Sequence, residues 1–149
     1  MKDRSPLQTF AMLFGIVFLL VGILGFIPGI TTNFDDIKFS GHESGAELLG
    51  IVQVSILENI IHLLYGIAGL AMAKTWDNSR LYFIGGGVIY LVLWIYGLVV
   101  DKDSSANFVP TNAAGDWLHF ILGVTMVGVG FLLGRSRDVP ARTTTTPMP

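Results

Sequence analysis

The chain has 149 residues, of which 52% are hydrophobic and 13% are charged, and it carries a formal net charge of -2. A soluble domain has about 25% charged residues, so this composition excludes most soluble enzymes and disordered regulators, and the absence of excess positive charge predicts no nucleic-acid partner. The chain has no cysteine, which excludes disulfides, thiolate metal sites and cysteine nucleophiles.

Four long apolar segments predict four membrane-spanning helices. A bilayer core about 30 Å thick needs roughly 20 apolar residues of helix. Residues 10–30, 52–73, 81–100 and 116–134 reach about that length, each with at most one charged residue. Because lipid offers no hydrogen-bond partner, a helix is the structure that satisfies such a backbone internally. We therefore predict an all-α integral membrane four-helix bundle formed by residues 1–134, followed by a disordered cytoplasmic tail at 135–149.

The basic residues predict the orientation of these helices. Seven of them lie in the N-terminal segment, the connection between the second and third spans, and the tail: Lys2, Arg4, Lys74, Arg80, Arg135, Arg137 and Arg142. The two longer connections contain only Lys38 and Lys102. Since positive residues stay on the cytoplasmic side, we expect a multi-pass protein of the plasma membrane with both termini cytoplasmic. The short connection also predicts that the second and third helices form a tight antiparallel pair.

The second and fourth spans share a polar pattern. Residues 59–66 (NIIHLLYG) and 116–123 (DWLHFILG) both have Asn or Asp, a histidine three residues later, and a glycine four residues after that. Both spans run in the same direction through the membrane. The pattern therefore predicts a parallel duplication of a helix pair.

These spans also contain the candidate intramembrane polar cluster, Glu58, Asn59, His62, Asp116 and His119. Residues three or four apart share a helix face, and such faces should point into the bundle because polar groups facing lipid are costly. Hydrogen bonds from Asn59 to His62 and from Asp116 to His119 would make the cluster a structural lock. Two histidines and two carboxylates can also ligate a transition metal, which makes Glu58, His62, Asp116 and His119 candidate metal ligands, and His62 with His119 could be the axial ligands of haem. A proton or solute path along the Glu58 face is a further alternative.

The sequence favours a non-enzymatic function. It has no nucleophile or phosphate-binding motif, and the glycines of the first, third and fourth spans indicate close helix packing. We expect a structural or accessory membrane protein, without catalytic residues, metal or cofactor, that acts through contacts with a second copy or with other membrane proteins. The alternatives are a metal- or haem-binding protein using His62 and His119, and a proton or solute path formed by an oligomer.

Several segments together resemble one family of small bacterial membrane proteins. They are residues 21–32 (VGILGFIPGITT), 49–55 (LGIVQVS), 59–66, 88–97 (VIYLVLWIYG), 107–110 (NFVP) and 117–123 (WLHFILG). The family is known as domain of unknown function 4383, and the resemblance covers about residues 8–134. It implies a multi-pass membrane protein with four spans and no assigned activity. In that family the residue before the asparagine is often histidine, whereas this chain has Glu58 there.

Overall fold

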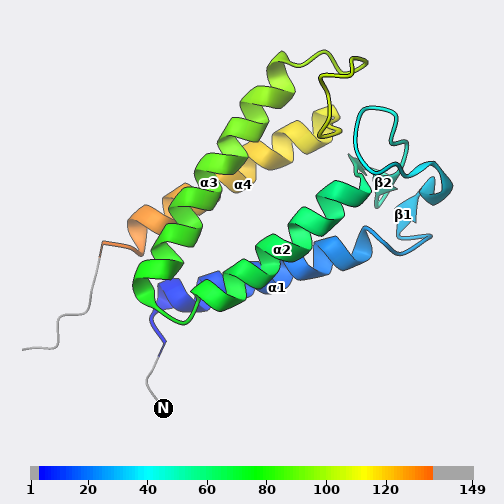
Figure 1. Ribbon diagram of the computed structural model, residues 1–149. Helices are drawn as coiled ribbons and strands as arrows, with labels where there is room; N and C mark the ends of the chain where they lie inside the picture. The colour runs from blue at the N-terminus through cyan, green and yellow to red at the C-terminus, as the bar shows by residue number, and fades with distance from the viewer. Residues whose placement is uncertain (1–3, 136–149) are drawn as a thin grey trace, which may run out of the picture.

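The structure is a computed structural model that describes residues 4–135 of the chain. In these residues there are four long helices, α1 (Pro6–Leu24), α2 (Ile56–Met72), α3 (Trp76–Val99) and α4 (Ala113–Leu132). The connection between α1 and α2 contains β1 (Thr31–Thr32), the short 3-10 helix η1 (Phe34–Asp36), β2 (Glu47–Leu48) and β3 (Val52–Gln53) (Figure 1). α1, α3 and α4 are long and apolar enough to cross a membrane, and α2 is a shorter apolar helix of 17 residues. The predicted tail lies almost wholly outside the described residues.

Polar caps set where the helices begin. Ser5 and Gln8 form a reciprocal capping box at the start of α1, and the side chains of Ser55, Thr75 and Asn112 each accept a backbone hydrogen bond at the starts of α2, α3 and α4. The helices are therefore displaced by several residues from the apolar segments. The second predicted span begins at residue 52, for example, but the first residues of that segment form β3.

The helices pack as two antiparallel hairpins, and the prediction of a tight pair between α2 and α3 is wrong. α1 packs along α2, and α3 packs along α4, whereas contact between α2 and α3 is much smaller (Figure 1). The turn at residues 73–75 therefore joins the ends of α2 and α3 without bringing their faces together. We call the two units the α1–α2 hairpin and the α3–α4 hairpin.

Glycines allow the close approach within each hairpin. A Cβ atom added at Gly15 would lie 2.8 Å from the backbone nitrogen of Leu70, and one added at Gly87 would lie 2.8 Å from that of Val127. Any side chain at these two positions would push the helices apart, as in other membrane helix pairs that pack through small residues. The glycine packing expected from the sequence is present, and it occurs inside the hairpins.

The interior and exterior of the helices have the distribution that lipid surroundings require. Aromatic rings and a methionine pack between the hairpins, with Phe18, Tyr82, Phe83, Tyr90 and Met126 buried. Aliphatic side chains cover the outside: Leu20, Leu64, Val92 and Ile121 are between 52% and 60% exposed. Exposed apolar surface on every helix is stable in hydrocarbon and not in water.

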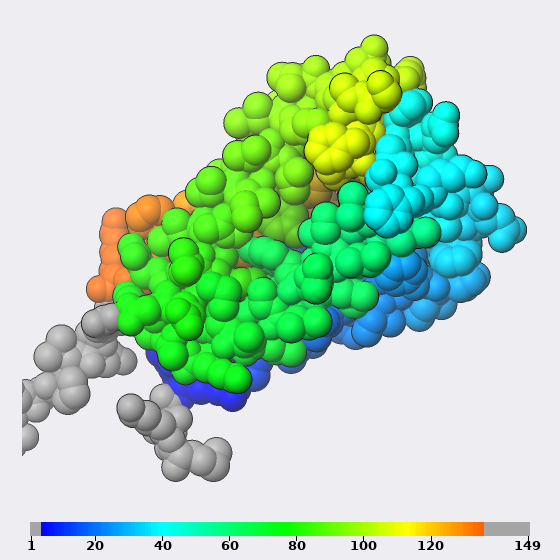
Figure 2. All heavy atoms as spheres, in the orientation of Figure 1, coloured from blue at the N-terminus to red at the C-terminus, as the bar shows by residue number. Residues whose placement is uncertain are grey.

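The two long connections fold together over one end of the helices. β1, β2 and β3 form a small antiparallel sheet, which the sequence analysis did not predict. The N–H of Gly41 donates a 2.9 Å hydrogen bond to the carbonyl of Phe108, and the Asn112 side chain donates to the carbonyl of Ile51 at 2.8 Å. Figure 2 shows this contact, with the first connection (cyan) against the second (yellow). The α2–α3 turn and both ends of the described chain lie at the opposite end of the molecule (Figure 1).

Candidate functional site

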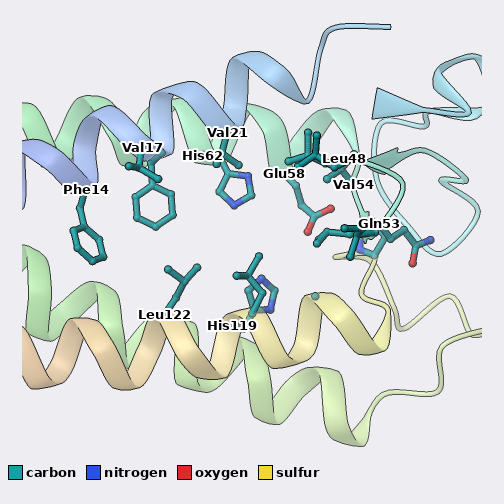
Figure 3. Close-up of a pocket in the computed structure, with 17 residues that line it drawn as sticks. Phe14, Val17, Val21, Leu48, Gln53, Val54, Glu58, His62, His119 and Leu122 are labelled. Atoms are coloured by element: carbon teal, nitrogen blue, oxygen red, sulfur yellow. The ribbon is translucent and has the colours of Figure 1, made fainter. Parts of the chain in front are cut away.

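A chamber of about 410 Å³ lies between the two hairpins. α1 and α4 face each other across it, α2 forms part of the wall, and the segment containing β2 and β3 covers it from the loop end (Figure 3). Most of the wall is aliphatic or aromatic, including Phe14 and Val21 from α1 and Leu122 from α4. A volume of this size falls within the range of small-molecule sites, about 300–1,000 Å³.

Three polar side chains of the predicted cluster line this apolar chamber. Glu58 and His62 enter from α2 and His119 enters from α4 (Figure 3). Glu58 is 8% exposed and His119 is 7% exposed. The Glu58 carboxylate accepts a 3.4 Å hydrogen bond from the Ser55 hydroxyl, and no group among residues 4–135 hydrogen-bonds to the buried Nδ1 atom of either imidazole. Each Nδ1 atom is closed off by packed protein, so the imidazole nitrogens open to the chamber are the Nε2 atoms, which make no hydrogen bond to another group among residues 4–135.

Aromatic rings hold the two imidazoles in place. Phe18 stacks on His62 with ring centroids 6.0 Å apart, and Tyr90 lies 5.6 Å from His119. Phe18 and Tyr90 in turn stack on each other at 5.6 Å, where the two hairpins meet. The histidines are thus linked through a continuous series of rings, with one imidazole at each end.

Asn59 and Asp116 do not line the chamber, and the predicted hydrogen bonds to the histidines are wrong. The side-chain amide of Asn59 donates instead to the backbone carbonyl of Gly25, at the end of α1, over 2.8 Å. Asp116 pairs at 2.7 Å with Lys102. Each polar residue therefore ties together the two helices of its own hairpin, because it faces the neighbouring helix and not the space between hairpins.

Lys102 is the functional neighbour that sequence reasoning missed. Its ammonium group donates to the carbonyl of Gly97 at 2.6 Å, to the hydroxyl of Thr111 at 2.7 Å and to the carboxylate of Asp116 at 2.7 Å. The Asn59 amide donates a hydrogen bond to a carbonyl at the end of α1, but the Asp116 carboxylate has no hydrogen to donate to the end of α3. Lys102 provides that donor in its place. In the repeated pattern Asp116 stands where α2 has Asn59, and this difference was the signal in the sequence that a cation lies nearby.

The two hairpins make equivalent contacts, as the predicted duplication requires. Three pairs of residues occupy matching positions of α2 and α4: the helix caps Ser55 and Asn112, the residues Asn59 and Asp116 that bond within each hairpin, and the histidines His62 and His119. Gly15 packs on Gly66 in one hairpin, and Gly87 packs on Gly123 in the other. The two hairpins differ inside the chamber, where Glu58 of α2 corresponds to Gly115 of α4. At this position the α2 wall carries a carboxyl group and the α4 wall carries no side chain.

The arrangement offers neutral hydrogen bonding more readily than metal binding. Among residues 4–135, no three His, Cys, Asp or Glu side chains come together in a group able to hold a metal ion. Asp116, one of the four candidate ligands, is turned toward Lys102. The chamber thus combines two imidazoles, one carboxyl group and apolar walls.

Comparison with family models decides the classification. The chain belongs to the DUF4383 family. The model described as "Domain of unknown function (DUF4383)" matches residues 8–132, which include all four long helices almost completely. This confirms the resemblance seen in the sequence motifs, and with the apolar helices it is consistent with a membrane protein. Neither the curated proteins nor the solved structures contain a match.

Proposed function

We propose that this DUF4383 protein is a non-enzymatic protein of the plasma membrane that takes a small, mainly apolar molecule from the bilayer into the chamber between its hairpins. The observation that carries the proposal is the chamber itself, in which the buried His119 and Glu58 point into an otherwise apolar space. Buried polar groups normally have hydrogen-bond partners, and those without one commonly mark functional positions. A bound molecule would provide partners for the Nε2 atoms of the two imidazoles and for the Glu58 carboxyl group, which line the chamber.

The opening of the chamber supports a route from the bilayer. Val17 of α1 and Leu118 of α4 both line the chamber, and their side chains are 55% and 41% exposed. Leu49 and Ile51, at the loop end, are also lining residues and are more than half exposed. An aliphatic rim favours entry of an apolar molecule from hydrocarbon over entry of a polar solute from water.

The charge distribution supports a multi-pass orientation with both termini cytoplasmic. Arg4, Lys74, Arg80 and Arg135 lie at the end of the molecule that carries the α2–α3 turn. Lys102 lies at the other end, where it is bound to Asp116. At 1.5 Å per residue α2 is about 26 Å long, and a span slightly shorter than the bilayer core is accommodated by local thinning of the membrane.

Contacts with a second copy or another membrane protein remain a prediction. The glycines that suggested such contacts are used inside the hairpins: Gly15 packs on Gly66 and Gly87 on Gly123. A partner would therefore meet the exposed aliphatic faces. The metal alternative receives less support, since no group of three metal-ligating side chains forms within residues 4–135.

The proposal is tested with adamantyl diazirine, a small photoreactive hydrocarbon, added to liposomes that contain the protein. We expect labelling of the chamber residues Val21 and Leu122, and excess adamantane should suppress it. Labelling of Leu20, which faces outward and is 52% exposed, should not be suppressed, because bulk lipid does not saturate.

Two glycines of α4 provide matched variants. A Cβ atom at Gly115 would make only ordinary contacts, 3.4 Å from Asn112 Oδ1, and one at Gly128 would meet no atom within 4 Å. Gly115→Leu fills the chamber and should remove the suppressible labelling, whereas Gly128→Leu should retain it. Equal labelling of the chamber in the two variants, or labelling that adamantane never suppresses, would overturn the proposal.

A further inference from the structure

We propose that the chamber binds the head group of a membrane quinone or quinol, with the ring between His62 and His119 and the tail leaving between α1 and α4. This inference rests on the proposed function, because it names the molecule that the chamber takes from the bilayer. It concerns binding, and it requires no electron transfer by the protein.

The lining argues for an uncharged head group. In the part of the chain that the structure describes, no lysine or arginine lines the chamber. A phosphate in this apolar space would lack the charged donors that phosphates need, and burying an unpaired charge is very costly. Lys102 lies outside the lining set, bound to Asp116 and to the end of α3. Phospholipid head groups are therefore unsuited to the site.

The two imidazoles argue for a head with an oxygen on two sides. A neutral imidazole has one nitrogen that donates and one that accepts, so it bonds equally to a quinone carbonyl or a quinol hydroxyl. His62 and His119 occupy matching positions of α2 and α4 and enter the chamber from opposite sides (Figure 3). A ring that carries oxygens at opposite edges matches this repeated arrangement, and Glu58 adds a third hydrogen-bonding group on the α2 side.

The aromatic side chains argue for a flat head. Phe14 and Phe18 line the chamber, and Phe18 is held between His62 and Tyr90 by stacking. Because these two stacked rings cover the faces of Phe18, it can meet a ligand only with its edge. Edge-on contacts with aromatic rings favour a planar conjugated ring, which gives a quinone an advantage over a flexible glyceride head.

The exit of the chamber suits an isoprenoid tail. Val17 and Leu118 form an aliphatic rim between α1 and α4, and both are exposed on the face where lipid would lie. A tail attached to a ring in the chamber would leave between these two residues, neither of which carries a charge. The position of the rim on the lipid-facing surface is what a membrane-dissolved ligand needs.

The test uses competition against adamantyl diazirine labelling of Val21 in liposomes. One competitor is a naphthoquinone with a tail of two isoprene units, and its matched control is a naphthalene with the same tail and no oxygens. We expect the naphthoquinone to suppress labelling at about tenfold lower concentration, because one net hydrogen bond corresponds to about that ratio. Dioleoylglycerol and phosphatidic acid test the flexible and the phosphorylated heads.

Variants of His62 and His119 test whether the preference for the naphthoquinone over the naphthalene arises from hydrogen bonds in the chamber. His62→Phe and His119→Phe should remove the advantage of the naphthoquinone over the naphthalene, whereas His119→Gln, which keeps a donor and an acceptor, should retain part of it. Adamantyl diazirine labelling itself should persist in all three variants, which shows that the chamber still forms.

The outcomes separate this inference from the proposed function. If the naphthalene competes as well as the naphthoquinone, or if either lipid competes better, the quinone inference is overturned while the chamber remains a binding site. If adamantane suppresses the labelling of Val21 but none of these four compounds does, only the quinone inference is overturned. If adamantane also fails, both the inference and the proposed function are overturned.

Discussion

The pair formed by Lys102 and Asp116 gives a quantitative test of how the two hairpins are related. Lys102→Met removes three hydrogen bonds at once, to the Gly97 carbonyl, to Thr111 and to Asp116. It leaves the Asp116 side chain, which is 9% exposed, without its cation. In the α1–α2 hairpin the corresponding residue is Asn59, whose amide reaches the helix end directly. Replacing Asp116 by asparagine should therefore recreate that simpler arrangement.

The expected magnitude follows from the exposure of the pair. Removing one partner of a fully buried ion pair costs about 3–5 kcal/mol. The Lys102 side chain is 38% exposed, so water weakens the ion pair and can hydrate the groups that lose Lys102. Both effects reduce the free-energy cost of the substitution. We expect Lys102→Met to destabilise the protein by about 2 kcal/mol. The double variant Lys102→Met with Asp116→Asn should lie within about 1 kcal/mol of the parent, since a neutral amide can donate to the Gly97 carbonyl.

Thermal unfolding in a mild detergent, followed by tryptophan fluorescence, measures these differences. For a chain of this size about 1 kcal/mol corresponds to a Tm shift of about 2–4 °C, so Lys102→Met should lower Tm by about 4–8 °C. Lys38→Met is the control, because the other lysine at the loop end makes no ion pair within residues 4–135. A double variant that is no more stable than Lys102→Met would refute the structural equivalence of Asn59 and Asp116.

Three further predictions follow from the same contacts. Gly115→Ala should raise the free energy of unfolding by about 0.5–1 kcal/mol, seen as a higher Tm, because the added methyl group meets only ordinary contacts; a lower Tm would contradict this placement. Gly87→Val should lower stability by about 1–3 kcal/mol because of the backbone of α4, while Gly85→Val, whose nearest contact is a leucine methyl at 3.8 Å, should have little effect. In this cysteine-free chain His42→Cys should react with an impermeant maleimide on intact cells and Asn78→Cys only after permeabilisation; the reverse pattern would invert the orientation.

The sequence predicted the helices, the repeat and the glycine packing because each depends on local composition or spacing. Hydropathy measures which residues favour hydrocarbon, and it identified all four helices. It placed their ends poorly because helix ends depend on hydrogen bonding by residues such as Ser5 and Asn112. The small sheet depends on pairing between residues distant in sequence, such as Thr31 with Leu48, and two-residue strands carry no periodic signal.

The candidate site was predicted in part. The cluster was treated as one face, but residues three apart on a helix differ in direction by about 60°. That difference sends Asn59 toward α1 and leaves His62 in the chamber. Which neighbour a face meets depends on helix pairing, and a short turn predicted the wrong pair. Lys102 was assigned only to a charged loop because its three partners lie elsewhere in the sequence.

Native mass spectrometry of the protein extracted with its surrounding lipid tests directly whether the chamber holds a molecule from the bilayer. We expect one uncharged small molecule per chain on the parent protein and on Gly128→Leu, and none on Gly115→Leu. A parent protein that carries no such molecule and acquires none from a lipid extract, or a molecule equally abundant on both glycine variants, would contradict this expectation.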